Sequence, residues 1–378
     1  MKIAGEPEST SKDEAEYHSH DFEWEDLKAE VEANPAFSYH LSPFVGPAAA
    51  TNSPPPPSSE AWRSFHRRHA SGKFFKERRY LLKEFPELLN RNDCAKILEV
   101  GCGNGSTAVS VLRASESITV FACDCSKDTL QKANEIISNS KGIDVKDRFC
   151  PFLLDVSKES FPDWLFCKAC QSSLGKADGH LSGYMFDLSH HKMIKERPVF
   201  LRENQCCIGG MDFITMIFTL SAIHFDIMPS TLKYCVSVLK PGGLLLFRDY
   251  GLYDMTMLRF SPCQRVGFRE YVRSDGTFSY FFSLDIVREL FCSAGLVELE
   301  LEYCCVSSVN RKNGKKMQRV GSLGLDSGSS SIAHRSERGT NRPPWIGFGL
   351  PFSLEGRSSE TLWSTRVAID GAFKITSP

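Results

Sequence analysis

The sequence predicts an α/β fold in which a doubly wound, mostly parallel sheet carries helices on both faces. Apolar runs of strand length alternate with segments of helical periodicity from residue 95 onward. A glycine-rich turn separates the first apolar run from the first helix. The chain has 378 residues, of which 42% are hydrophobic and 24% charged, as is ordinary for a globular protein.

The predicted elements follow one another in a regular order. Strands are expected at 96–100, 117–123, 147–154, 213–219, 243–248 and 297–306. Helices are expected at 106–114, 127–138, 228–239 and 284–294. The turn Lys240-Pro-Gly-Gly243 stops the third of these helices and leads into the fifth strand. Because strands alternate with helices, the strands are expected to run parallel.

The N-terminal part differs from the rest in composition. Residues 1–60 are acidic and then proline-rich, which predicts a disordered arm. Helical apolar spacing at 22–31 marks one short exception, which could dock onto the domain or onto a partner. Residues 61–94 form a basic helical region, with one helix expected over 61–92.

The α/β domain is expected to span residues 95–320. A polar insertion at about 162–210 interrupts it between the third and fourth strands and predicts a surface excursion. Residues 321–378 are rich in serine and glycine and predict a poorly ordered tail.

Composition excludes several functional classes. The longest nearly apolar run, 211–223, is far shorter than a membrane-spanning helix, which needs about 18 residues or more, so no membrane association is expected. The first 33 residues are strongly acidic, unlike a transit peptide. With no secretory signal, the 14 cysteines predict reduced thiols and a cytosolic or nuclear protein. Because 45 basic residues nearly balance 46 acidic ones, any nucleic-acid surface must be a local patch.

The strongest local motif is the loop Glu99-Val-Gly-Cys-Gly-Asn-Gly105 between a strand and a helix. Its glycines allow a ligand to approach the backbone, and the following helix directs free N–H groups toward that ligand. A dinucleotide fingerprint would require its third glycine at Ser106. The observed spacing, with an acid two residues before Gly101, is instead typical of S-adenosylmethionine sites. The predicted cofactor-binding residues of this loop are Glu99, Gly101, Gly103 and Gly105.

Acidic residues end the next two strands. Asp124 follows the second strand, where a carboxylate can accept both ribose hydroxyl protons, and Asp155 follows the third, where it can accept from the adenine amino group. The carboxyl ends of parallel strands border one crevice. Each acid alone could simply cap the next helix. Together with Glu99 they favour a nucleoside-binding edge.

Several segments carry a family resemblance. They are the loop LEVGCGNG, the segment TMIFTLSAIH, the segments LLFRDYGLYDMTMLRF and YVRSDGTFSYFF, and the upstream WRSFHRRHASGKFFKERRYLLKEFPEL. In these the chain resembles the tRNA 3-methylcytidine methyltransferases, which are class I, S-adenosylmethionine-dependent enzymes acting on the anticodon loop. The matches cover 62–161 and 211–320. The first loop is common to all class I methyltransferases, whereas RDYGLYD with YVRSDGT is specific.

The resemblance implies S-adenosylmethionine as cofactor and tRNA as partner. It implies cofactor contacts at Trp62, Gly101, Asp124, Asp155, Val156 and Ile217. His66 stands where the family usually has an aromatic residue. Some relatives also need an aminoacyl-tRNA synthetase or another protein to present the tRNA.

The chain departs from the family after Val320. The expected closing antiparallel strand is replaced there by Gly321-Ser-Leu-Gly-Leu, so the sheet is expected to lack a complete final strand. This leaves open a non-catalytic methyltransferase-like subunit or an inactive splice form that binds RNA or a partner. A small-molecule or protein methyltransferase is a third reading, favoured by the generic loop alone.

The candidate catalytic group is Arg248-Asp249-Tyr250 at the end of the fifth strand. Asp249 could supply negative charge near a base that becomes cationic, and Tyr250 could stack on that base. An internal ion pair without chemistry is the alternative for the whole segment Arg248-Asp249-Tyr250-Gly251. The resemblance places the opposite wall of the substrate region at Tyr271, Arg273 and Asp275.

The basic helical region is the candidate tRNA surface. Its proposed phosphate contacts are Arg67, Arg68, Lys73, Lys76 and Arg78, with a second basic group at Lys312, Lys315, Lys316 and Arg319. The alternative is a solvated helix face.

Cysteines in the insertion suggest a metal site. Cys167-x-x-Cys170 and the pair Cys206-Cys207 offer four thiols, but a CxxC followed by CC matches zinc-ribbon spacing poorly. Ordinary reduced cysteines and no metal are therefore expected.

Overall fold

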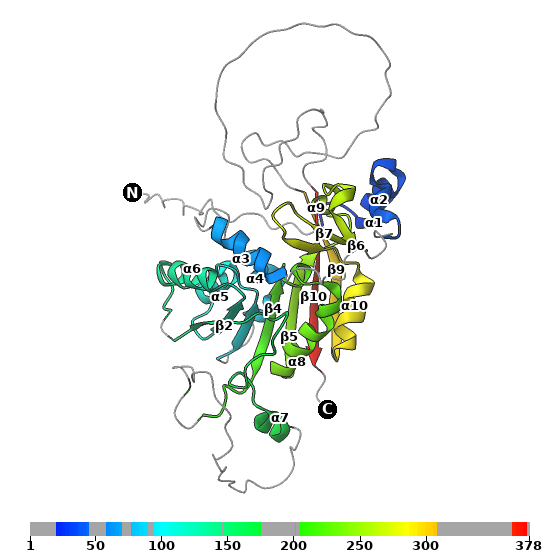
Figure 1. Cartoon of the computed structure of the whole chain (residues 1–378). Helices are drawn as coiled ribbons and strands as arrows, with labels where there is room; N and C mark the ends of the chain where they lie inside the picture. Colours follow the sequence, from blue (N-terminus) through cyan, green and yellow to red (C-terminus); the bar gives the residue numbers. More distant parts are fainter. Residues whose placement is uncertain are drawn as a thin grey trace, which may run out of the picture.

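The computed structural model contains a seven-stranded sheet with helices on both faces (Figure 1). The structure describes residues 20–44, 58–69, 77–89, 94–145, 147–174, 201, 205–307 and 365–375. The strand order is β3-β2-β1-β4-β5-β10-β9, and only β10 runs antiparallel to its neighbours. The strands are β1 (Lys96–Val100), β2 (Thr119–Asp124), β3 (Phe149–Leu153), β4 (Met211–Ile217), β5 (Leu239–Tyr250), β9 (Leu296–Ser307) and β10 (Thr365–Ile375).

Two hydrophobic clusters hold the helices against the sheet. On one face α8 (Met228–Val238) and α10 (Leu284–Ser293) contribute Leu232 and Val287. The other face is covered by α4 (Leu81–Glu84), α5 (Ser106–Ala114) and α6 (Lys127–Ser138). The helices predicted at 106–114 and 127–138 are confirmed residue for residue.

The final strand corrects the sequence prediction. Residues 365–375 form β10 between β5 and β9, so the expectation of an incomplete sheet and of an entirely unstructured tail is wrong. Ile369 and Phe373 are fully buried. A central strand is buried on both faces and need not alternate, and here Asp370 and Gly371 interrupt the apolar residues, which hid the strand in the sequence. Residues 308–364 lie outside the described residues.

The N-terminal region is also more structured than expected. Helices α1 (Trp24–Ala33) and α2 (Ser38–Leu41), joined by a turn of 3₁₀ helix at Pro35–Phe37, pack on the main domain. Leu27 and Val31 are buried there. The docking expected for 22–31 therefore occurs onto the domain itself, and the prediction of a disordered arm is wrong for residues 20–44.

The basic region is divided where one helix was predicted. Helix α3 (Ser58–Arg68) and the short α4 are separate elements, because residues 77–78 have no regular secondary structure and residues 79–80 form a turn before α4. Pro86 opens a 3₁₀ turn, Pro86–Leu88, directly after α4. Proline lacks the backbone donor that a continuing helix needs.

The remaining elements are a small sheet and several short helices. A small antiparallel sheet contains β6 (Arg265–Gly267), β7 (Glu270–Val272) and β8 (Phe278–Tyr280). The short helices are α7 (Lys168–Leu174), η3 (Leu220–Ala222), η4 (Phe225–Ile227), α9 (Met255–Leu258) and η5 (Pro262–Gln264). Among the residues described, no helix has the length and apolarity to cross a membrane.

Candidate active site

The glycine loop lies between β1 and α5. Gly101, Gly103 and Gly105 have φ of 68°, 55° and 81°, a region that residues with a side chain rarely adopt. A Cβ on Gly101 would lie 2.5 Å from Cγ2 of Thr219. The Thr219 hydroxyl donates to the carbonyl of Val100 at 2.9 Å. The loop therefore passes tightly against the residue that follows β4, and its shape depends on Gly101.

Glu99 lies beneath this loop. Its carboxylate is buried and accepts a hydrogen bond from the N–H of Ala108 in α5 at 3.1 Å. Burial raises the pKa of Glu99 to about 7, although the nearby Arg78 guanidinium acts to lower it. Glu99 thus links the end of β1 to the first turn of α5, which fixes the helix N-terminus behind the loop.

The raised pKa of Glu99 predicts a pH effect on stability. The pKa of Glu99 is about 4.5 in the unfolded chain and about 7 in the folded chain. At pH values between these two, only the folded form retains the proton. The free energy of unfolding should therefore fall as pH rises through this window, by up to about 3 kcal/mol. In urea unfolding at about pH 5 and pH 8, Glu99→Gln should show a smaller loss than the natural chain. Equal losses in both proteins would contradict this role.

Asp124 ends β2 and is buried. One carboxylate oxygen accepts from the N–H of Gly103 at 3.0 Å and the other from the N–H of Ser126 at 2.9 Å. Burial raises the pKa of Asp124, while its charge interaction with His66 acts to lower it. Since a carboxylate has about four lone-pair sites, each oxygen can accept one further hydrogen bond.

Helix α3 brings aromatic rings to the same edge. Trp62 and His66 are one turn apart, with ring centroids separated by 6.2 Å. Burial lowers the pKa of His66, although the nearby Asp124 carboxylate acts to raise it. The indole Nε1 of Trp62 is buried and has no hydrogen-bond partner among the described residues. Such a buried donor is costly unless a partner satisfies it.

Asp155 follows β3 and faces α3. It accepts from Lys158 at 2.9 Å and from the Ser157 hydroxyl at 2.5 Å, and an Nη of Arg63 lies 3.7 Å away. Burial acts to raise the pKa of Asp155, but these hydrogen bonds and charges outweigh it and lower the pKa. The neighbouring Val156 is buried. The ends of β2 and β3 thus present two acids to one helix, as the sequence predicts.

Arg248 and Asp249 point to opposite faces of β5. The Asp249 carboxylate is fully buried and accepts from the N–H groups of Ser221 and Tyr250, each at 2.9 Å. Burial raises the pKa of Asp249 to about 6. This carboxylate joins the end of β5 to the η3 turn that follows Ile217 at the end of β4.

Arg248 is part of a buried ion-pair cluster. Its guanidinium is buried, donates to Asp370 on β10 at 2.8 Å and forms an ion pair with Glu84 of α4. It also lies over the ring of Tyr80. The prediction that Arg248 is catalytic is therefore wrong. Successive residues of a strand face opposite sides, so Arg248 and Asp249 cannot act together.

Tyr250 lies at the open end of β5. Its ring is partly buried, 5.0 Å from Phe218 and 5.6 Å from Phe281 between ring centroids. Phe218 has φ of 55°, an uncommon conformation for a bulky residue that often marks a functional site. Phe218 and Thr219 were not predicted as site residues, and their only signal in the sequence was their position at the end of the strand predicted at 213–219.

Tyr271 is not part of an open wall. Its side chain is fully buried, its hydroxyl is 2.8 Å from Nδ1 of His40 in α2, and its ring stacks on Phe260. The prediction of Tyr271 as a substrate contact is therefore wrong, because the docked N-terminal helices cover it. Arg273 lies over the same Phe260 ring.

Asp275 meets the basic helix. One carboxylate oxygen accepts from the Thr277 hydroxyl at 2.6 Å, and the other lies 3.8 Å from Arg68 of α3. The turn between β7 and β8 therefore adjoins α3, which brings together two residues that were predicted separately as substrate contacts.

Of the other basic candidates, the structure describes Arg67 and Arg78. Arg67 is 59% exposed and lies 3.5 Å from Glu60. Arg78 is half-buried against the glycine loop, with Nη1 3.4 Å from the Thr107 hydroxyl. Outside the described residues are Lys73, Lys76, Lys312, Lys315, Lys316 and Arg319. Arg63, which the sequence indicated only as part of the basic region, lies beside Asp155 at the end of β3.

Comparisons with known proteins identify the family of the chain. A methyltransferase domain family matches residues 67–301. The human tRNA N(3)-cytidine methyltransferase METTL6 is 33% identical over 263 residues, which cover 68% of this chain and 76% of that protein. The Drosophila melanogaster tRNA N(3)-methylcytidine methyltransferase Mettl2 is 36% identical over 267 residues, covering 68% of each chain.

The relatives extend beyond these two. The Xenopus tropicalis tRNA N(3)-cytidine methyltransferase METTL2 is 31% identical over 303 residues, covering 70% of this chain and 75% of that protein. A solved S-adenosylmethionine-dependent methyltransferase from Anabaena variabilis is 12% identical, with a TM-score of 0.46 over 86% of this chain and 98% of that one. On its sequence similarity to the curated relatives, the chain belongs to the tRNA N(3)-cytidine methyltransferase family.

Proposed function

We propose that this chain transfers a methyl group from S-adenosylmethionine to N3 of a cytidine in the anticodon loop of tRNA. The observation that carries the proposal is the similarity to the tRNA N(3)-cytidine methyltransferases, which spans two thirds of this chain. The non-catalytic alternative depended on a missing closing strand. Because β10 completes the sheet, the reason for favouring the non-catalytic alternative is removed.

The cofactor edge fits S-adenosylmethionine. When bound, the cofactor supplies a methyl group on a positively charged sulfur. Asp124 retains acceptor sites for the two ribose hydroxyls, and the buried Nε1 of Trp62 offers a donor without a partner. The positive-φ glycines bring the backbone close to the ligand. Ile217, Asp155 and Val156 complete the candidate edge.

The chain's own residues would position the base. N3 of cytidine carries an in-plane lone pair at neutral pH, so the transfer needs no strong base; it needs alignment and stabilisation of a base that becomes cationic. The rings of Tyr250 and Phe218 stand at the end of β5 and could stack on the base. The Asp249 carboxylate accepts hydrogen bonds from two backbone N–H groups, which orients the end of β5. It also adds negative charge near this end of the strand.

The phosphates of the tRNA require cations. We assign this role to the exposed part of α3, where Arg67 and Arg68 are 59% and 52% exposed. The proposal includes a synthetase or another protein that presents the tRNA to this chain.

Removing the Arg67 charge should weaken tRNA binding in a salt-dependent way. Arg67→Gln is expected to reduce the slope of log affinity against log salt by about one, as loss of one phosphate contact does. Fluorescence titration of labelled tRNA at several salt concentrations measures this slope. Arg288→Gln on α10 is the matched control, because Arg288 is 46% exposed and also paired with an acid. Identical slopes in the two variants would remove α3 from the tRNA surface.

The decisive experiment for the activity is incubation of the purified chain with total tRNA and labelled S-adenosylmethionine, followed by digestion to nucleosides. Label in 3-methylcytidine supports the proposal. Asp249→Asn keeps the side-chain shape and should retain cofactor binding while losing turnover. Tight cofactor binding without product, even after addition of cell extract to supply a presenting protein, would contradict the proposed reaction.

A further inference from the structure

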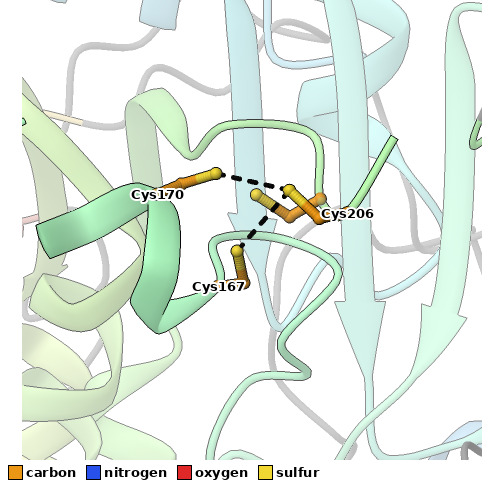
Figure 2. A group of neighbouring side chains, drawn as sticks. Cys167, Cys170 and Cys206 are labelled. Carbon is orange, nitrogen blue, oxygen red and sulfur yellow. Dashed lines mark hydrogen bonds between the residues drawn. The ribbon is translucent and has the colours of Figure 1, made fainter. Parts of the chain in front are cut away.

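We propose that Cys167, Cys170, Cys206 and Cys207 bind one zinc ion. Their four sulfur atoms lie within 4.8 Å of one another. Dashed lines in Figure 2 join Sγ of Cys206 to the other two labelled thiols, which lie 3.7 Å (Cys167) and 3.4 Å (Cys170) from it. With Zn–S bonds of about 2.3 Å, a tetrahedral site has sulfur atoms about 3.8 Å apart. The fold thus collects four suitable ligands at nearly the spacing that zinc requires.

A disulfide does not explain this cluster. The sulfur separations far exceed the bonded distance of about 2.05 Å. All four residues are free cysteines. Four soft sulfur ligands and no oxygen or imidazole ligand favour zinc over magnesium or calcium.

The backbone around the thiols resembles that of a metal site. The N–H of Cys170 donates to the sulfur of Cys167, and the N–H of Gly209 donates to the sulfur of Cys207. Such hydrogen bonds orient thiolate ligands and offset their charge. Gly209 and Gly210 have φ of 81° and 80°, so the turn after the cysteine pair requires glycine.

The two halves of the cluster are held together without the metal. The N–H of Ile208 donates to the carbonyl of Trp164, and the N–H of Gly210 to that of Leu165, both at 2.8 Å. Phe166 and Cys207 are buried in the main hydrophobic cluster. The ligands therefore sit on backbone that is already fixed to the domain, which lowers the entropic cost of assembling the site.

The position of the cluster indicates a structural role. Cys206 and Cys207 precede β4, so they lie at the amino end of that strand, whereas the cofactor edge lies at the carboxyl ends. Four protein ligands leave no open coordination position for catalysis. The zinc would clamp the two ends of the insertion, residues 162–210, to the sheet. Sequence spacing alone favours free thiols, because it does not show that the two ends of the insertion lie side by side.

Metal analysis tests this proposal independently of methyl transfer. The full chain, purified without metal-chelate resin from zinc-supplemented medium, should contain about one zinc per molecule by mass spectrometry. A mercurial thiol reagent should release it. Cys170→Ser should lose nearly all of the zinc, while Cys292→Ser, an exposed cysteine on α10, should retain it.

Three outcomes would overturn the proposal: natural protein without zinc, iron in its place, or full zinc in Cys170→Ser. If Cys170→Ser does not fold, cobalt substitution of the natural chain decides the question. Tetrahedral cobalt bound by four thiolates gives intense visible absorption and sulfur-to-metal charge transfer, and their absence from a folded, cobalt-loaded chain would equally exclude the site.

Discussion

Gly101→Ala is expected to weaken S-adenosylmethionine binding by at least about 100-fold, equivalent to about 2.7 kcal/mol. Two effects combine. Gly101 has φ of 68°, which a Cβ makes unfavourable, and the added carbon would lie 2.5 Å from Cγ2 and 2.6 Å from Oγ1 of Thr219. Thr219 must then move and give up its hydrogen bond to Val100, which displaces the loop that we propose contacts the cofactor. Calorimetric titration with S-adenosylmethionine measures the change.

Gly142→Ala separates the two effects. Gly142 has φ of 75°, but its nearest neighbour is Nη1 of Arg113 at 4.0 Å, so alanine there carries the backbone strain without the collision. We expect a small loss of thermal stability and unchanged cofactor affinity. If Gly101→Ala bound the cofactor within about threefold of the natural chain, the loop would not be the cofactor site.

Arg248→Met is expected to lower the free energy of unfolding by about 3–5 kcal/mol. The substitution leaves the carboxylates of Asp370 and Glu84 buried without their shared cation. Both acids lie within the sheet and its covering helix, where an unpaired charge is far more costly than on the surface. Urea unfolding followed by circular dichroism measures the loss.

Two further variants test the physical cause. Arg288→Met removes an arginine that is 46% exposed and should change stability by less than about 1 kcal/mol. The triple variant Arg248→Met, Asp370→Leu, Glu84→Met removes the buried charges together and should recover most of the loss. A triple variant as unstable as Arg248→Met would show that shape, and not unpaired charge, governs this region.

Local sequence patterns predict the local structure well. The glycine loop, α5 and α6 match because their signals lie within a few neighbouring residues, such as the Ser126 cap whose hydroxyl accepts from the N–H of Thr129. Asp124 and Asp155 converge as expected because parallel strands direct their carboxyl ends to one edge. The family assignment likewise rested on short specific segments and is confirmed.

Long-range contacts explain what the sequence could not reveal. Tyr271 is covered by His40, more than 200 residues earlier in the chain, so its burial has no local signal. Arg248 and Asp370 are paired across 122 positions, and the strand that contains Asp370 lacks strict alternation. The side to which Arg248 points depends on the register between β5 and β10, which the sequence of either strand alone does not encode.

The position of β10 has a consequence for how the protein folds during synthesis. β9 ends at Ser307, and β10, its neighbour among the described strands of the seven-stranded sheet, begins at Thr365. A nascent chain that has completed β9 therefore exposes two unpaired strand edges, on β5 and on β9, until the later segment emerges. Such edges favour pairing with other chains, so ribosome-bound intermediates of this length should depend on chaperone protection. Once β10 is made, the long connection is no obstacle, because closure entropy grows only slowly with loop length.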